Sequence, residues 1–179
     1  MTIIALAHKA QVGKDTAADY LVKNYGFRKM AFAEPLKEAA KIIYGLTDEQ
    51  VYGDLKEVVD SFWGETPRYI LQTAGTNALR THHRQDIWVM ATKRKLLQDL
   101  SANWVISDCR FSNEAEMIKE LGGFVVRIDA NFPGRKPIKT GRHSSEIDML
   151  EYNDWDWILE NNTTKEEYYK KIDDMMEFF

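Results

Sequence analysis

The chain has 179 residues, 44% hydrophobic and 29% charged, which is typical of one globular domain. Its formal net charge of −4 argues against nucleic-acid binding by the surface as a whole, so an anion site requires a local cluster of cations. The single cysteine, Cys109, excludes an intrachain disulfide and a cysteine-based zinc site.

Apolar runs and helical spacing alternate along the chain. Apolar runs predict strands at 2–7, 27–33, 103–108 and 124–129, with a last short strand within 155–161. Helical spacing, prolines and glycine stops predict helices at 14–25, 34–45, 67–79, about 85–100, 113–123 and 164–178. The polar segment 46–66 predicts no single structure. Alternating strands and helices predict an α/β fold, with a parallel β-sheet flanked by helices on both faces.

The segment 8–16, HKAQVGKDT, lies between the first strand and the first helix and is close to the phosphate-binding pattern G-x-x-x-x-G-K-[ST]. In such a loop, Gly13 lets the backbone approach phosphates closely and Lys14 binds the β- and γ-phosphates. Thr16 can reach an α-phosphate. Val12 lies in the same loop, so we expect it to line the nucleotide site.

Three residues of this loop depart from the pattern or add to it. Asp15 stands where a hydroxyl usually contacts Mg²⁺, so it would hold the metal directly or through water. Lys9 adds positive charge. His8 replaces the first glycine, so it must adopt that glycine's backbone angles or indicate a different loop shape. The alternative interpretation is an ordinary strand, turn and helix with a surface lysine.

The strand at 103–108 ends in Asp108, with Arg110 two residues on. An open α/β sheet places its site at the carboxyl ends of its strands. Asp108 would orient Mg²⁺ or accept a proton and contact substrate, and Arg110 would clamp a phosphate with two parallel hydrogen bonds. The alternative role of this segment is to cap the next helix, through Ser112 or Asn113.

A basic loop follows the strand at 124–129. Its cations and titratable groups are Arg135, Lys136, Lys139, Arg142 and His143. This cluster predicts a mobile lid, at approximately 131–146, that closes over phosphates and excludes water; the alternative interpretation is an ordinary solvated loop. We expect Arg135 and Arg142 to stabilise the transferred phosphoryl group. His143 and Glu146, three residues apart, would share one face and anchor the lid.

The predicted helix at 67–79 carries Arg68 and Gln72 one turn apart, so both can face one crevice. A glutamine amide can pair with the edge of a nucleobase. Trp88 could stack on a base, although a lone tryptophan is more often part of a core.

In order along the chain, GKDTAADYL, EPLKEA, RYILQTAGT, DIWV, ISDCR and an H-x-x-E segment ending in ILENNTTKEE resemble the deoxynucleoside monophosphate kinases of tailed phages, such as the T-even phage enzyme. The segment 46–66 is an exception, because it looks shorter here than in the T-even enzyme. The loop also departs from the family, since His8 replaces its glycine and Lys9, Ala10 and Gln11 differ. The resemblance implies one P-loop kinase domain at 1–179, with a helical NMP-binding region at approximately 34–100 and a lid. It also implies ATP and Mg²⁺ as cofactors and deoxynucleotide biosynthesis as the setting.

The resemblance further implies the roles of individual residues. Gly13, Lys14, Asp15 and Thr16 would hold the ATP phosphates and Mg²⁺. The acceptor would contact Lys37, Arg68, Gln72, Gly75, Thr76, Trp88, Asp108 and Arg110, with His143 and Glu146. The turn at Asn161, Asn162 and Thr163 would border the donor adenine.

Two other functions stay open on the sequence. One is a P-loop kinase for another small phosphorylated acceptor, phosphomevalonate or dephospho-coenzyme A. The other is a non-catalytic nucleotide-binding protein with a decayed loop. The expected partners are small-molecule nucleotides, with no nucleic acid and no membrane, and an apolar helix face would suit a homodimer. No signal peptide or bilayer-spanning run is evident, so we expect a cytoplasmic protein, in the host cytoplasm if a phage encodes it.

Overall fold

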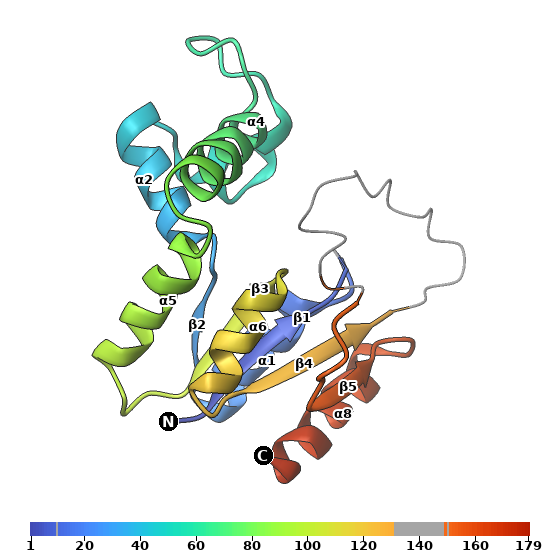
Figure 1. Cartoon of the computed structure of the whole chain (residues 1–179). Coiled ribbons are helices and arrows are strands. Elements are labelled where there is room, and N and C mark those ends of the chain that lie inside the picture. Colours follow the sequence, from blue (N-terminus) through green and yellow to red (C-terminus); the bar gives the residue numbers. More distant parts are fainter. Residues whose placement is uncertain (10, 131–148, 150) are drawn as a thin grey trace. The chain divides into compact units, whose positions relative to one another are not determined.

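The computed structural model describes residues 1–9, 11–130, 149 and 151–179 (Figure 1). The chain divides into two compact units, one made of residues 1–31 and 95–179 and the other of residues 32–94. None of the described helices is both long and apolar enough to cross a membrane.

The first unit is built on a five-stranded sheet in the order β2-β3-β1-β4-β5, and every pair of neighbours is parallel. The strands are β1 Ile3–Ala7, β2 Arg28–Met30, β3 Trp104–Cys109, β4 Phe124–Asp129 and β5 Trp157–Glu160. All five predicted strands are therefore confirmed, although β2 is shorter than the predicted 27–33. The central strand, β1, is buried at every position, which explains its uninterrupted apolar run.

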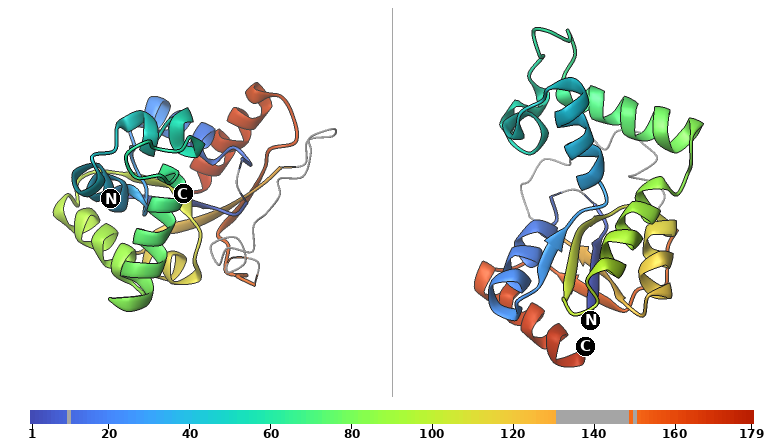
Figure 2. Two further views of the ribbon diagram at one scale, coloured as in Figure 1. Left: turned by 90° about the horizontal axis from the view of Figure 1, so that it is seen from above. Right: turned by 90° about the vertical axis from the view of Figure 1, so that its left-hand side faces the viewer.

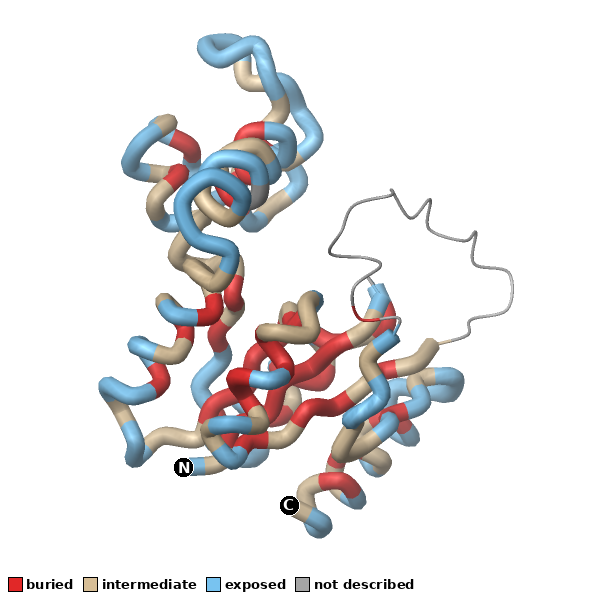
Figure 3. Tube along the Cα trace, in the orientation of Figure 1, coloured by how far each residue is buried: buried red, intermediate tan, exposed pale blue. Residues whose placement is uncertain are grey.

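Helices cover both faces of this sheet, as predicted. They are α1 Lys14–Tyr25, α6 Ser112–Glu120 and α8 Lys165–Phe178. Figure 2 shows α1 and α8 on one face and α6 on the other. The α1 and α8 face is closed by a buried cluster in which Ile4 and Leu6 pack with Leu21 and Ile172. Figure 3 shows how the buried positions, in red, follow the strands of the sheet. Because side chains alternate along a strand, Ile3 points to the other face, toward Ile118 of α6.

The second unit is helical. Its elements are α2 Glu34–Tyr44, α3 Asp48–Val51, the short 3-10 helix η1 Asp54–Glu57, α4 Pro67–Gln72, η2 Thr73–Thr81 and the first part of α5 Ile87–Gln98. A small core of its own includes Ala40, Leu46, Val51, Ile70 and Leu71. The predicted helix 67–79 is present, but from Thr73 it continues as a π-helix. Its wider turn cannot be distinguished from α-helical spacing in the sequence.

Candidate active site

The loop between β1 and α1 has an unusual backbone. His8, Gln11 and Gly13 all have positive φ, at 90°, 59° and 103°. Gly13 is the residue before α1, and its carbonyl accepts the first helical hydrogen bond, from the N–H of Ala17 at 3.0 Å. His8 therefore adopts a backbone angle that glycine reaches more easily, at a cost of about 1–2 kcal/mol for a residue with a Cβ.

Lys14 lies inside this loop rather than on its surface. Its side chain is buried, and its ammonium donates to the carbonyls of His8 at 2.9 Å and Lys9 at 2.5 Å. Burial, together with the charge of Arg110, lowers the pKa of Lys14 to about 8, against the opposing effect of the carboxylates of Asp15 and Asp108. The ammonium is thus held where the loop curls around it, at the N-terminus of a helix.

Two side chains from the C-terminal part of the chain hold the loop from outside. The Asn161 amide donates to the carbonyl of Val12 at 2.9 Å, and the Tyr168 hydroxyl donates to the carbonyl of Gly13 at 3.3 Å. A Cβ at Gly13 would overlap the Asn161 amide nitrogen. The loop therefore requires glycine at this position for two reasons, its φ and its close contact with Asn161.

His8 is fixed through its ring. Its Nδ1 lies 2.8 Å from Oδ1 of Asp129, at the end of β4, and the same oxygen accepts from Nε of Arg127 at 2.9 Å. Burial, the largest cause, lowers the pKa of His8 although Asp129 opposes the shift. At neutral pH the imidazole is therefore uncharged, and its Nδ1 is also within hydrogen-bond distance of the Ile128 carbonyl, at 3.4 Å.

Asp108 and Arg110 lie at the carboxyl end of β3, close enough for their charges to act on the pKa of Lys14. The structure thus brings together the three groups predicted from GKDT and ISDCR. The buried carboxylate of Glu114 accepts the backbone N–H groups of Arg110, at 2.8 Å, and Phe111, at 3.2 Å. Glu114, rather than Ser112 or Asn113, satisfies these two donors before α6.

Asp15 points outward from the first turn of α1. Its carboxylate lies 3.0 Å from the ammonium of Lys29, which also contacts Asp19 at 2.9 Å. Burial opposes the shift, but hydrogen bonds to Asp19 and Asp15 raise the pKa of Lys29. Thr16, the next predicted phosphate contact, is half-buried on the same turn.

The loop fits a bound triphosphate, because it combines a close-packed glycine, a buried lysine and the free N–H groups of a helix N-terminus. For Mg²⁺, the described residues hold no group of three or more carboxylate, histidine or cysteine ligands. In phosphoryl-transfer sites Mg²⁺ usually takes one or two carboxylates, waters and the phosphates as its ligands. The carboxylates predicted for that role from the sequence are Asp15 and Asp108.

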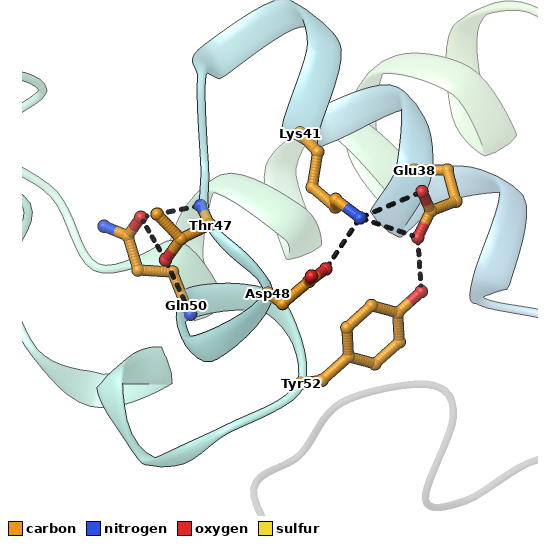
Figure 4. A network of polar contacts seen from close by, with 6 residues as sticks. All are labelled: Glu38, Lys41, Thr47, Asp48, Gln50 and Tyr52. Atoms are coloured by element: carbon orange, nitrogen blue, oxygen red, sulfur yellow. Dashed lines mark hydrogen bonds and ion pairs between the residues drawn. The ribbon is translucent and has the colours of Figure 1, made fainter.

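Six of the predicted acceptor residues lie in the helical unit: Lys37, Arg68, Gln72, Gly75, Thr76 and Trp88. The Lys37 ammonium lies 4.3 Å from the centre of the Tyr52 ring. The Tyr52 hydroxyl donates to Glu38 at 2.7 Å, and Lys41 joins Glu38, at 3.1 Å, to Asp48, at 2.6 Å (Figure 4). The ring that faces Lys37 therefore comes from the segment 46–66, for which the sequence predicted no single structure.

The other acceptor candidates lie along α4, η2 and α5. Arg68 is exposed and pairs with Glu57 of η1, and Gln72 is exposed. Gly75 is buried, and a Cβ there would overlap Leu36. The half-buried Trp88 ring donates from Nε1 to the Gly75 carbonyl at 3.3 Å, so it braces η2. Thr76 lies within η2.

The remaining predictions fall on the periphery of the loop or outside the described residues. Lys9 is exposed, and Asn162 and Thr163 are exposed in the turn after β5. The predicted lid and its residues Arg135, Arg142, His143 and Glu146 lie outside the described residues.

Sequence reasoning missed four side chains that contact the loop or its neighbours: Asp129, Tyr168, Lys29 and Glu114. Asp129 carries the same signal as Asp108, a carboxylate at the carboxyl end of an apolar strand, and could have been found by that criterion. No local signal marks Tyr168, because its partner Gly13 lies 155 positions earlier in the chain.

Comparison with known proteins agrees with this geometry. Among solved structures, the chain matches shikimate kinase from Acinetobacter baumannii in complex with shikimate, with a TM-score of 0.55, 12% identity and coverage of 99% of this chain and 92% of that one. It also matches dephospho-CoA kinase from Campylobacter jejuni, with a TM-score of 0.52, 14% identity and coverage of 98% and 95%. At these identities the likeness shows the fold, that of the P-loop kinases.

Two sequence comparisons are more specific. The family described as "Deoxynucleotide monophosphate kinase" matches residues 54–172. A protein of Acanthamoeba polyphaga mimivirus, described as "Putative deoxynucleotide monophosphate kinase", is 40% identical over an alignment of 190 positions, which covers 96% of this chain and 94% of the viral protein. The chain belongs to the deoxynucleotide monophosphate kinase family.

Proposed function

We propose that this protein transfers the γ-phosphoryl group of ATP to a deoxynucleoside monophosphate, giving ADP and a deoxynucleoside diphosphate in a Mg²⁺-dependent reaction. Family membership supports the substrate class. The observation that carries the proposal is the buried Lys14 at the start of α1, bonded to its own loop, with the charges of Asp108 and Arg110 acting on it.

The donor phosphates would bind the first N–H groups of α1 and the Lys14 ammonium, which neutralises charge on the β- and γ-phosphates. Phosphate oxygens would then join the His8 and Lys9 carbonyls around the ammonium, and their negative charge would keep Lys14 protonated. Mg²⁺, when bound, would supply positive charge that offsets the charge of the donor phosphates. Asp15 and Asp108 would orient it directly or through water.

The acceptor would be held by residues of the helical unit, with Lys37 and Arg68 as cations for its phosphate and Gln72 for its base. An α-phosphate oxygen of the acceptor attacks in line. Because that oxygen is already ionised at neutral pH, no strong general base is required. Arg110 would neutralise charge that spreads over the transferred group, with Arg135 and Arg142 proposed to join it from the lid.

The experiment that tests the proposal is an acceptor panel. ADP release is measured with ATP and Mg²⁺ against all common deoxynucleoside and nucleoside monophosphates, with phosphomevalonate and dephospho-coenzyme A beside them. The proposal expects turnover with one or more deoxynucleoside monophosphates and none with the two other acceptors. Turnover of dephospho-coenzyme A or phosphomevalonate alone would replace it, and ATP binding without turnover of any acceptor would indicate a nucleotide-binding protein.

A further inference from the structure

The loop clamp, defined here as Asn161 and Tyr168, contacts two consecutive peptide groups of the phosphate loop. Asn161 binds the carbonyl of Val12 and Tyr168 binds the carbonyl of Gly13. These carbonyls belong to the peptide planes that carry the N–H groups of Gly13 and Lys14. In a trans peptide the C=O and N–H point in opposite directions, so fixing each carbonyl also aims the N–H of the next residue.

Both clamp residues are themselves held firmly. The backbone N–H of Asn161 donates to the carbonyl of Asp129 at 2.7 Å, which ties the turn after β5 to the end of β4. Tyr168 is 1% exposed and packs in the core cluster that α1 and α8 share with the sheet. Its burial raises the pKa of the Tyr168 hydroxyl, which therefore stays protonated and able to donate.

We infer that Asn161 and Tyr168 are positioning residues for the donor phosphates. Each holds a loop carbonyl outward so that the N–H groups of Gly13 and Lys14 face the bound triphosphate. The inference rests on the proposed function and gives Asn161 a different task from the adenine contact expected from the family resemblance. The Asn161 amide donates to the backbone of the loop, so we expect it to affect the shape of the loop rather than to contact a base.

The two roles of Asn161 differ in which ligands they affect. A residue that touches adenine contributes to the binding of ATP and nothing to the binding of inorganic triphosphate. A residue that orients the loop contributes equally to both, because both ligands present the same phosphates. Inorganic triphosphate is therefore the probe that separates the roles.

The test compares Asn161→Ala and Tyr168→Phe with the wild type, and uses Tyr169→Phe as the matched control. Tyr169 is the next residue on α8. Its ring centre lies 4.1 Å from the ring centre of Tyr20 and 5.5 Å from the ammonium of Lys165. Dissociation constants of ATP and inorganic triphosphate are measured by calorimetry, with KM for the acceptor and the ligand-free melting temperature.

We expect each clamp variant to weaken ATP and inorganic triphosphate alike, by about three- to tenfold, the effect of one net hydrogen bond. The KM for the deoxynucleoside monophosphate and the constants of Tyr169→Phe should stay at wild-type values. A purely structural role would lower the melting temperature without changing either dissociation constant. Tyr168→Phe keeps the ring in the core, so it decides the question if Asn161→Ala does not fold.

Two results would overturn the inference while leaving the proposed function intact. One is a wild type that phosphorylates deoxynucleoside monophosphates and whose two clamp variants bind triphosphate as tightly as it does. The other is an Asn161→Ala protein that loses affinity for ATP but not for triphosphate, which would make Asn161 an adenine contact. A wild type that binds neither ligand would instead overturn the proposed function, and the inference with it.

Discussion

The imidazole of His8 lies 2.8 Å from the carboxylate of Asp129, across the gap between the phosphate loop and the end of β4. This contact accompanies a positive φ at His8, where the loop pattern has glycine. His8 is thus a residue whose backbone is strained and whose side chain is anchored, and the same residue offers its carbonyl to Lys14.

Substitutions at His8 should separate strain from anchoring. His8→Ala loses the Asp129 contact and keeps the strained φ, whereas His8→Gly loses the contact and releases the strain. We expect His8→Gly to be more stable than His8→Ala by about 1 kcal/mol, measured by denaturant unfolding. Equal stabilities would show that the loop changes shape around the substituted residue.

His8 should also make stability depend on pH. Its folded-state pKa is lowered from 6.5, so the unfolded chain binds the proton at a higher pH than the folded chain. Stability from this group is therefore complete above about pH 6.5 and is lost as the pH falls through the folded-state pKa. Between pH 7.5 and 5 the wild type should lose more unfolding free energy than His8→Gly, and parallel losses would contradict the assignment.

Lys14→Ala should lower the kinase rate by at least about 10²-fold, the scale of one preorganised charge contact in a transition state. Lys23→Ala removes an exposed lysine from the last turn of the same helix, so it serves as the control. A Lys14→Ala enzyme with nearly full turnover in a coupled ADP assay would refute the role of this lysine.

Gly13→Ala should lower the free energy of unfolding by more than backbone strain alone would. At Gly13, with φ at 103°, a Cβ would overlap the Asn161 amide, whereas Gly26 also has a positive φ, at 68°, but open space around it. Gly26→Ala should therefore cost about 1 kcal/mol and Gly13→Ala clearly more. Adding Asn161→Ala to Gly13→Ala should recover part of the difference in unfolding free energy, and strict additivity would show that the two positions do not touch.

Asp15 and Asp19 offer a matched pair, because both contact the ammonium of Lys29. If Asp15 orients Mg²⁺, Asp15→Asn should raise the Mg²⁺ concentration needed for half-maximal rate several-fold. Asp19→Asn should leave it unchanged, since it removes a carboxylate from the same lysine one turn farther along α1. An equal effect of both substitutions would attribute the change to Lys29 rather than to the metal.

Tyr52 provides a test in the helical unit. Tyr52→Leu removes the ring that faces the Lys37 ammonium, whereas Tyr52→Phe keeps the ring and loses only the hydrogen bond to Glu38. An exposed cation–π contact is worth about 0.5–1 kcal/mol, so Tyr52→Leu should raise the acceptor KM about two- to fivefold while the ATP KM stays constant. Tyr52→Phe should raise the acceptor KM less than Tyr52→Leu does. A larger change in the ATP KM than in the acceptor KM would refute a role of the Tyr52 ring in acceptor binding.

The fold was largely predictable because parallel strands buried on both faces leave uninterrupted apolar runs, as β1 does at Ile3–Ala7. The loop was predictable because GKDT follows such a run and begins a helix. The hydrogen bonds of Asn161 and Tyr168 to the loop were not, since they join positions 149 and 155 residues apart. The segment 46–66 was also beyond prediction, because α3 and η1 have only four residues each.

The place of β1 in the sheet has a consequence for how the protein is made. The strand is synthesised before both of its neighbours, which pair with it through Ile3 and Trp104 on one side and Ile4 and Phe124 on the other. Because Ile3 pairs with Trp104, more than 100 further residues must be synthesised before this apolar segment gains a partner strand. Such long-range pairing slows folding and leaves an apolar, aggregation-prone strand exposed in the meantime. A nascent chain halted before β4 would contain HKAQVGKDT without the contacts that Asp129 and Asn161 make with this loop, and it would be a natural client for chaperones.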